Sequence, residues 1–209
     1  MPRRYDSTLR QMQAQRTREA VLDAGQALIT ETGYARMTMR AIAERAGVSV
    51  DTIYLHFRSK AAVLKALLDI AVGGDEAPIP VADRDWVHQI RGQPGARPAL
   101  AEFAASVTSV HARLAPLFIA ARAAADADAT AAALWEARKS ERLHGMHDFA
   151  AHLLGTGELQ PTLTTSDTRD RVFALASPEL YGLLVLELGW RPERYTNWLT
   201  ELLTQQLLH

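Results

Sequence analysis

Residues 49–60 bring together side chains that can make both hydrogen bonds and apolar contacts. If this stretch is helical, Ile53 and Phe57 lie four residues apart and turn inward together. Polar and apolar side chains then face outward together, and two cationic residues follow in the sequence. The set is Val50, Asp51, Thr52, Tyr54, Leu55 and His56, and the cations are Arg58 and Lys60. A helix that only filled a structural corner would not need this mixture, which favours contact with DNA.

The neighbouring residues predict the two helices that would position this set. Thr38 can cap a helix whose apolar residues follow at i, i+3, i+4 and i+7. They are Met39, Ile42, Ala43 and Ala46. Gly47 would end that helix, because glycine enters the left-handed conformation without steric cost. Ser49 then caps the next helix, and Asp51 lies in its first turn, where the helix dipole favours negative charge. The pattern is a helix-turn-helix, although a purely structural helical hairpin can share the same caps.

The same stretch resembles the N-terminal pattern of the TetR family of bacterial transcriptional regulators, T-x-R-x-I-A-x-x-A-G-V-S-x-x-T-x-Y-x-H-F-x-S-K. The residues in register are Thr38, Arg40, Ile42, Ala43, Ala46, Gly47, Val48, Ser49, Thr52, Tyr54, His56, Phe57, Ser59 and Lys60. The resemblance covers about residues 16–72. Residues 177–199 are loosely similar to an actinobacterial-type branch of the family.

The pattern and the resemblance together imply an all-α protein of about nine helices. A three-helix helix-turn-helix DNA-binding domain would precede a larger helical domain for ligand binding and dimerisation. We place these domains at residues 1–72 and 73–209, because four prolines and four glycines fall within residues 73–98. The expected helices lie near residues 10–32, 38–46, 49–57, 59–72, 83–91, 100–125, 129–154, 167–188 and 192–208. Pro116 is expected to interrupt one of them and Pro178 to kink another.

By position in the family pattern, four residues are expected to bind the DNA backbone. They are Thr38, Tyr54, His56 and Lys60, whose hydroxyl, imidazole and ammonium groups suit phosphate oxygens. The expected base-facing residues are Arg40, Val50, Asp51, Thr52 and Leu55. Ser49, the cap of the recognition helix, completes the predicted DNA-binding set. Two copies of the chain would read a palindromic operator in double-stranded DNA, with half-sites about 34–36 Å apart or a multiple of that.

The resemblance also implies a small-molecule effector held between helices of the larger domain. The candidate contacts are Trp86, Phe103, Val107, His111, Phe118, Trp135, Met146 and Trp190. Ordinary core packing is the competing interpretation for every one of them. Arg138 and Arg142 share a helix face with Trp135, so either an anionic effector or a solvated face is possible.

The last two expected helices are more apolar than a surface helix requires. The first offers Val172, Phe173, Leu180, Leu183, Leu184 and Leu186, and the second Tyr195, Trp198, Leu199, Leu202, Leu203 and Leu207. Burial within one chain would explain part of this. A homodimer interface formed by both helices, as the resemblance implies, explains it better.

Composition suits a cytoplasmic protein that does not span a membrane. There is no cysteine, so disulfides and thiolate metal sites are excluded. The N-terminal residues lack the apolar core of a signal peptide. The run 180–188 contains Glu187 and is too short to span a bilayer. Residues 1–60 carry ten basic and six acidic residues, whereas the remainder carries 13 and 18. A basic N-terminal end, with an arm containing Arg3, Arg4 and Arg10, suits phosphates.

Two alternatives remain open at this point. Glu141 and His144 have the Glu-x-x-His spacing of metal sites in helical bundles, and His147 and Asp148 follow closely. The chain has no second copy of that motif and no phosphate-binding or nucleophile motif, so we expect no enzyme, cofactor or metal. The other alternative is a ligand-independent dimeric DNA-binding protein. An apolar cavity in the larger domain would favour a regulator that responds to a small molecule. A solid core would favour the ligand-independent protein, and bound metal would favour the enzyme.

Overall fold

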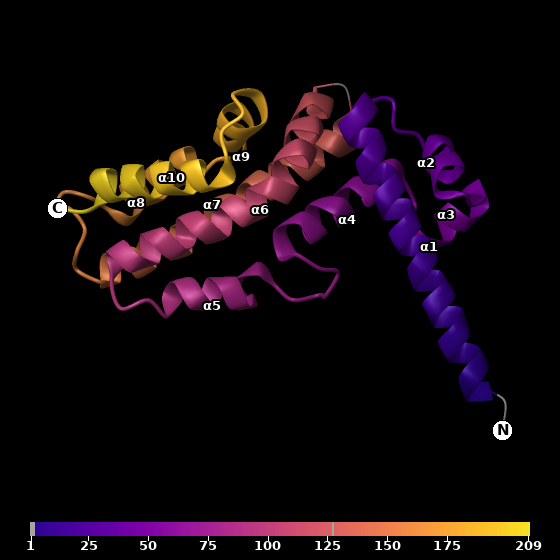
Figure 1. Cartoon of the computed structure of the whole chain (residues 1–209), viewed down its shortest axis with the longest axis horizontal. Helices are drawn as coiled ribbons and strands as arrows, with labels where there is room; N and C mark the ends of the chain where they lie inside the picture. The colour runs from indigo at the N-terminus through magenta and orange to yellow at the C-terminus, as the bar shows by residue number, and fades with distance from the viewer. Residues whose placement is uncertain (1–2, 127) are drawn as a thin grey trace. The chain divides into compact units, whose positions relative to one another are not determined.

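The computed structural model describes residues 3–126 and 128–209, with side chains from residue 9 onward in these ranges. The described residues form helices and no strands, which confirms the expected all-α fold. In chain order the elements are α1 (Arg3–Thr32), α2 (Met39–Ala46), α3 (Val50–His56), α4 (Lys60–Gly73), the 3-10 turn η1 (Val81–Asp83), α5 (Asp85–Arg91), α6 (Ala96–Ala125), α7 (Ala129–Gly155), α8 (Thr165–Leu175), α9 (Pro178–Tyr181), the π-helical η2 (Gly182–Glu187) and α10 (Pro192–Leu207) (Figure 1).

Two helices are longer than expected. Helix α1 begins at Arg3 rather than near residue 10, since no glycine or proline interrupts the residues between. The side chains of Arg3 and Arg4, predicted to form a basic arm, lie outside the described side chains. Helix α6 runs through Pro116 without the expected interruption. Leu117 and Phe118 are buried directly after the proline, so tertiary packing outweighs the missing backbone hydrogen bond.

The predicted helix over residues 167–188 is instead three elements. Helix α8 ends at Leu175, and Ser177 starts α9 by accepting a hydrogen bond from the Leu180 amide at 3.1 Å. Pro178 occupies the first turn of α9, where its fixed φ is favourable and its missing N–H costs nothing. The proline therefore begins a helix and does not kink one.

The chain divides into two compact units. The first comprises Met1–Asp69 and Ala120–Leu134, and the second comprises Ile70–Ile119 and Trp135–His209. Helices α6 and α7 thus contribute residues to both units. A boundary drawn from the change in composition near residue 72 does not anticipate the return of residues 120–134 to the first unit.

The helix-turn-helix of the first unit forms as its caps predict. The Thr38 hydroxyl accepts a hydrogen bond from the Ala41 amide at 3.0 Å, and Ser49 accepts one from Thr52 at 3.1 Å. Gly47 adopts φ 68° and ψ 31°, the left-handed conformation in which a side chain would be strained. Ile53 and Phe57 are buried as expected. The two motif helices are therefore held by local hydrogen bonds and by a shared apolar core.

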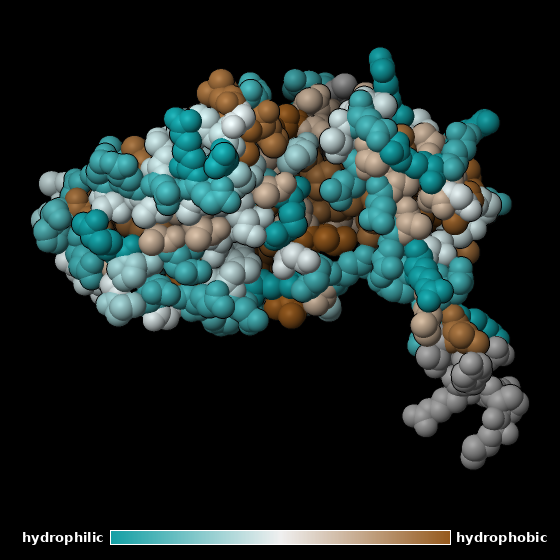
Figure 2. All heavy atoms as spheres, in the orientation of Figure 1, coloured by the Kyte–Doolittle hydropathy of each residue, from teal (hydrophilic) through white to brown (hydrophobic). Residues whose placement is uncertain are grey.

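The second unit has a core of apolar side chains from α5 through α10. Helix α10 buries one stripe completely, formed by Tyr195, Leu199, Leu203 and Leu207. For these four residues the alternative explanation, burial within one chain, is the correct one, because the unit's own core covers them. Among the apolar side chains of this unit that stay exposed, Leu183, Leu186 and Leu188 follow one another in the segment after α9. Figure 2 shows brown, apolar side chains gathered at the edge where α9 and η2 lie.

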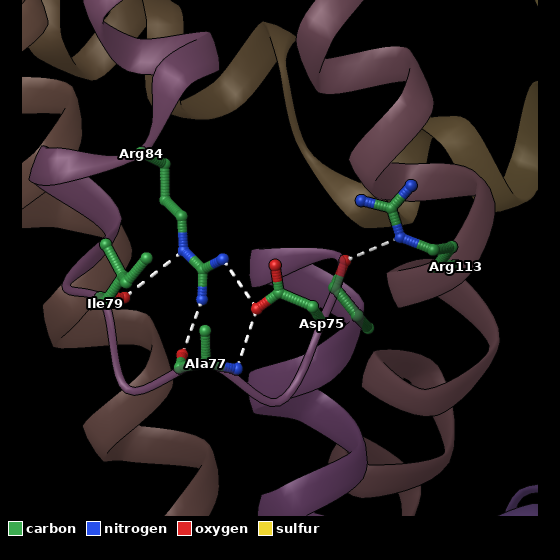
Figure 3. A network of polar contacts seen from close by, with 6 residues as sticks. Asp75, Ala77, Ile79, Arg84 and Arg113 are labelled. Atoms are coloured by element: carbon green, nitrogen blue, oxygen red, sulfur yellow. Dashed lines mark hydrogen bonds and ion pairs between the residues drawn. The ribbon is translucent and has the colours of Figure 1, made fainter.

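A buried arginine organises the connector between α4 and α5. The Arg84 guanidinium donates to Asp75 Oδ1 at 2.8 Å and to the carbonyl oxygens of Ala77 at 2.8 Å and Ile79 at 3.3 Å (Figure 3). A Cβ on Gly73 would lie 2.7 Å from Arg84 Nη2, so glycine at the end of α4 leaves room for this group. The proline- and glycine-rich stretch is therefore an ordered loop.

A second arginine of the same unit fixes the end of α4. Arg113 of α6 donates from Nε to the carbonyl of Ala71 at 3.1 Å (Figure 3). This bond satisfies one of the last carbonyls of α4, which have no partner within the helix.

Helix α6 is the most apolar long helix among those described. By length and composition alone α6 could cross a membrane. The expectation from sequence concerned only the apolar run 180–188 as a membrane-spanning candidate. Of the most apolar window of α6, 56% is buried inside the protein, as in the core helix of a soluble domain.

Candidate nucleic-acid interface and effector site

The outward face of α3 carries the predicted recognition residues. Leu55 is 85% exposed and Tyr54 is 52% exposed, and Asp51 is exposed beside them. Thr52 and His56 are half-buried at the edges of this face. No predicted DNA-contacting side chain is buried, so α3 offers a mixed polar and apolar surface of the kind that can reach base edges.

Two hydroxyls of the predicted interface are already used as helix caps. Thr38 accepts from Ala41, and Ser49 accepts from Thr52 while its oxygen also lies 2.7 Å from Thr52 Oγ1. A hydroxyl has two acceptor lone pairs and one donor, so capping leaves the Thr38 O–H free to donate to a phosphate. The cap also fixes where that hydroxyl points.

Arg40 is presented on the surface of α2 in an ion pair. Its Nε donates to Glu44 Oε1 at 2.9 Å, and the side chains are 83% and 65% exposed. An exposed pair of this kind contributes little to stability, because water screens it. Arg40 can therefore exchange Glu44 for another acceptor, such as guanine O6 and N7, at small cost.

Lys60, a predicted phosphate contact, is partly engaged within its own unit. Its ammonium lies 4.2 Å from the centroid of the Tyr34 ring and 3.9 Å from Asp128 Oδ2. Burial and the negative charge of Asp128 raise the pKa of Tyr34 to about 12. Hydrogen bonds from the backbone of Ala131 and Thr130 help to lower the pKa of Asp128. The sequence pattern did not reveal this contact, since Asp128 lies in the distant segment that joins the first unit.

The predicted effector residues do not form a single group. Phe103 and Val107 belong to the core of the second unit, with Trp86 and Met146 packed against it. The ring of Phe103 stacks on Phe149 with centroids 4.4 Å apart. Core packing is thus the observed role of these four predicted residues.

The other four predicted effector residues lie in three places. Phe118 and Trp135 pack on each other at 4.4 Å, and Trp190 lies edge to face with Trp198 at 6.1 Å. His111 is apart from these pairs, with its ring 5.8 Å from that of Tyr181.

A group of buried polar side chains surrounds His111. Within the described residues, His111 Nδ1, Arg142 Nε and the Tyr195 hydroxyl are buried without a hydrogen-bond partner. Burial and the charge of Arg142 lower the pKa of His111 to about 3, and burial lowers the pKa of Arg142 to about 10 despite the carboxylate of Glu179. Burial also raises the pKa of Tyr195. Sequence reasoning named His111 and Arg142 but missed Tyr195, whose spacing matched the apolar stripe of α10.

A surface groove of about 630 Å³ lies along α6 and α10. Most of its lining residues are polar, among them Arg97, Asn197, Thr200, Glu201 and Gln205. The groove shares no residue with the predicted effector set.

The Glu-x-x-His motif on α7 does not form a metal site in the described part of the chain. His144 is exposed, and its Nε2 lies 3.8 Å from Asp148 Oδ2. No group of three or more histidine, aspartate or glutamate side chains there could hold a metal ion. The structure therefore gives the metalloenzyme alternative no support.

Comparison with known proteins supports the helix-turn-helix independently. The family described as "Bacterial regulatory proteins, tetR family" matches residues 21–67. The tetracycline repressor protein class D of Escherichia coli is 34% identical over 79 residues, which are 37% of this chain and 36% of that protein. The HTH-type transcriptional regulator TtgR of Pseudomonas putida is 44% identical over 57 residues, or 27% of each chain. The chain thus matches about a third of the length of these relatives, or less. The family match at residues 21–67 contains the predicted DNA-binding residues.

The whole fold is shared with solved regulators. The transcriptional regulator FadR from Bacillus subtilis, in complex with stearoyl-CoA, superposes with a TM-score of 0.71 at 21% identity. The likeness covers 88% of this chain and 96% of that chain, so it includes both compact units. By the match of its helix-turn-helix sequence, residues 21–67 of the chain belong to the TetR family of bacterial regulatory proteins.

Proposed function

We propose that the protein is a DNA-binding transcriptional repressor that leaves a palindromic operator when a small-molecule effector binds. The observation that carries this proposal is the exposed face of α3. Leu55 is 85% exposed although Ile53, two residues earlier, is completely buried. A leucine so exposed on a well-capped helix does nothing for the fold, whereas it can pack on a thymine methyl group. Residues 1–72 would bind DNA, and residues 73–209 would bind the effector and dimerise.

The charges around α3 support contact with phosphates. Arg58 is exposed directly after the helix, and Tyr54, His56 and Lys60 supply further donors. Contacts to phosphate fix the orientation of a protein on the duplex but do not read its sequence. We therefore assign base reading to Arg40, Val50, Asp51, Thr52 and Leu55.

A homodimer is the second part of the proposal. One seven-residue helix reaches too few bases to select an operator, so two copies are needed. Leu183, Leu186 and Leu188 are 44%, 50% and 62% exposed, close together on the segment that follows α9. Neighbouring exposed leucines are typical of a surface that another protein covers. We propose that η2 and the exposed side of α10 form the dimer interface.

The effector is the third part. The FadR relative, of similar fold, binds stearoyl-CoA, and buried polar groups without partners lie inside the corresponding larger unit of this chain. We propose that this unit binds a small molecule and that the protein acts in the cytoplasm. A ligand shifts the equilibrium only if it prefers the conformation that does not bind DNA.

Selection of binding sites from random double-stranded DNA with the full chain tests the proposal directly. The expected product is an inverted repeat whose half-sites are centred about one helical turn, or a whole multiple of it, apart. A Leu55→Glu variant should recover no such sequence, whereas Lys65→Ala, which removes an exposed lysine of α4, should recover the same one. Recovery of unrelated sequences by the unaltered chain at low salt would contradict the proposal. A selected operator that no small molecule releases would support the ligand-independent alternative.

A further inference from the structure

Among the buried polar atoms of the second unit that have no hydrogen-bond partner in the described part of the chain, three belong to one cluster. They are Nδ1 of His111 on α6, Nε of Arg142 on α7 and the hydroxyl of Tyr195 on α10. The exposed fraction is 4% for His111 and zero for Tyr195. Buried polar atoms without hydrogen bonds are destabilising, so a native protein seldom keeps them unless something else binds them.

These groups converge from three helices. The ring of His111 lies 5.8 Å from Tyr181, and the ring of Tyr181 lies 5.0 Å from Tyr195. The positive charge of Arg142 acts on both His111 and Tyr195. The groups are therefore close enough to contact one small ligand together.

Arg142 is held in place by Phe173. Its guanidinium carbon lies 3.7 Å from the centroid of the Phe173 ring, and Nη2 donates to the carbonyl oxygen of Phe173. The contact orients the guanidinium and leaves its Nε–H without an acceptor. An oriented guanidinium is well suited to a carboxylate, because its parallel N–H groups match the two oxygens.

The hydrogen-bond donors of the cluster also suit an anion. Glu179 interacts with Arg142, although burial has the larger effect on the pKa of the arginine. Tyr195 keeps its proton and His111 stays neutral at physiological pH, so both can donate hydrogen bonds. A ligand with a single negative charge suits this set best, since Glu179 would repel a second one.

We propose that the effector is a monocarboxylate with an apolar body, and that Arg142, Tyr195 and His111 bind its carboxylate inside the second unit. The apolar body would lie against aromatic and aliphatic neighbours such as Phe173, Tyr181 and Val107. This inference rests on the proposed effector-controlled function, and it adds the chemical class of the ligand and the residues that recognise it.

Matched probes test the inference by calorimetry on the full chain without DNA. Benzoate, phenylacetate and octanoate are compared with benzamide, phenylacetamide and octanamide, which keep each apolar body but lack the charge. At least one carboxylate should bind and raise the melting temperature, and its amide should bind about 10- to 100-fold more weakly. Arg142→Gln should bind that carboxylate more weakly by the same factor. Arg138→Gln, one turn earlier on α7 and paired with Glu141 at 2.8 Å, should keep the affinity.

A second variant tests the inference even if Arg142→Gln does not fold. Tyr195→Phe removes only the hydroxyl and should weaken carboxylate binding with little effect on the amides. If no carboxylate binds, if the amides bind equally well, or if Tyr195→Phe and Arg142→Gln both keep the affinity, the inference is overturned. Operator binding is measured separately, so failure of the ligand class leaves the DNA-binding proposal intact.

Discussion

The ammonium of Lys60 lies 3.9 Å from the carboxylate of Asp128, and each side chain is about 30% exposed. Lys60 is the first residue of α4 and a predicted phosphate contact, whereas Asp128 directly precedes α7. The same carboxylate accepts hydrogen bonds from the amides of Thr130 and Ala131 at 2.9 and 3.1 Å. Asp128 therefore caps α7, and in the proposed function it would also compete with DNA for the charge of Lys60.

Replacing Asp128 with asparagine separates these roles. Asparagine caps a helix as well as aspartate does, but it carries no charge to hold Lys60. We expect Asp128→Asn to tighten binding to all DNA sequences by about two- to fivefold, the range of a weak surface ion pair. Fluorescence anisotropy with operator and scrambled duplexes measures this. Asp126→Asn makes the same change in net charge at an exposed site nearby, and an equal gain in that variant would show that the Lys60 contact is irrelevant.

Phosphate and base contacts should respond differently to mutation. Tyr54→Phe and Lys60→Ala remove groups assigned to the backbone, so binding to every sequence should weaken, and the salt dependence should become less steep for the lysine variant. Arg40→Ala should cost about 1–3 kcal/mol at one operator position and relax the preference there. Binding curves for single-base operator variants at several salt concentrations distinguish these effects. Uniform loss in all three variants would contradict the division of roles.

Arg84 should matter for stability far more than its place in a loop implies. Its side chain is about nine-tenths buried and binds one carboxylate and two carbonyl groups. We expect Arg84→Ala to lower the free energy of unfolding by about 2–3 kcal/mol, because it leaves those acceptors unsatisfied. Urea unfolding measures the change. Arg91→Ala, at an exposed position of α5, should stay within about 0.5 kcal/mol of the unaltered chain.

His111 should make the protein sensitive to mild acid. Its pKa is lowered from 6.5 to about 3 in the folded protein, so only the unfolded chain takes up a proton between these values. The stability from the neutral imidazole is complete above pH 6.5 and is lost progressively as the pH falls toward about 3. Between about pH 7.5 and about pH 5.5, the free energy of unfolding should fall about 1.4 kcal/mol further in the unaltered chain than in His111→Asn. His88→Asn, an exposed site, should retain the full dependence, and an unchanged slope in His111→Asn would contradict the burial argument.

The dimer interface can be tested at the exposed leucines. Leu186→Lys places a charge where a partner would bury it, so sedimentation velocity should show a shift from dimer to monomer. Ile79→Lys is the control, since Ile79 is 46% exposed in the connector and outside the proposed interface. A monomeric unaltered chain, or a dimer that tolerates Leu186→Lys, would place the interface elsewhere.

Features set by neighbouring residues were predictable, and those set by distant residues were not. The caps at Thr38 and Ser49 and the turn at Gly47 depend on a few consecutive residues, so their positions followed from the sequence. The continuity of α6 through Pro116 depends on packing against other helices, which local rules cannot weigh. Tyr195 matched an apolar spacing, but its hydroxyl joins His111 and Arg142 only after three helices assemble. The contact between Lys60 and Asp128 has the same origin.

The contrast between Leu55 and Ile53 affects how such a protein can diversify. Selection for a stable fold acts on Ile53, which is completely buried, and hardly at all on Leu55, which is 85% exposed. If Leu55 reads the operator as proposed, a duplicated gene can therefore change its target site through single substitutions at position 55 without first passing through an unstable intermediate. New regulatory circuits become accessible while the scaffold that presents them remains unaltered.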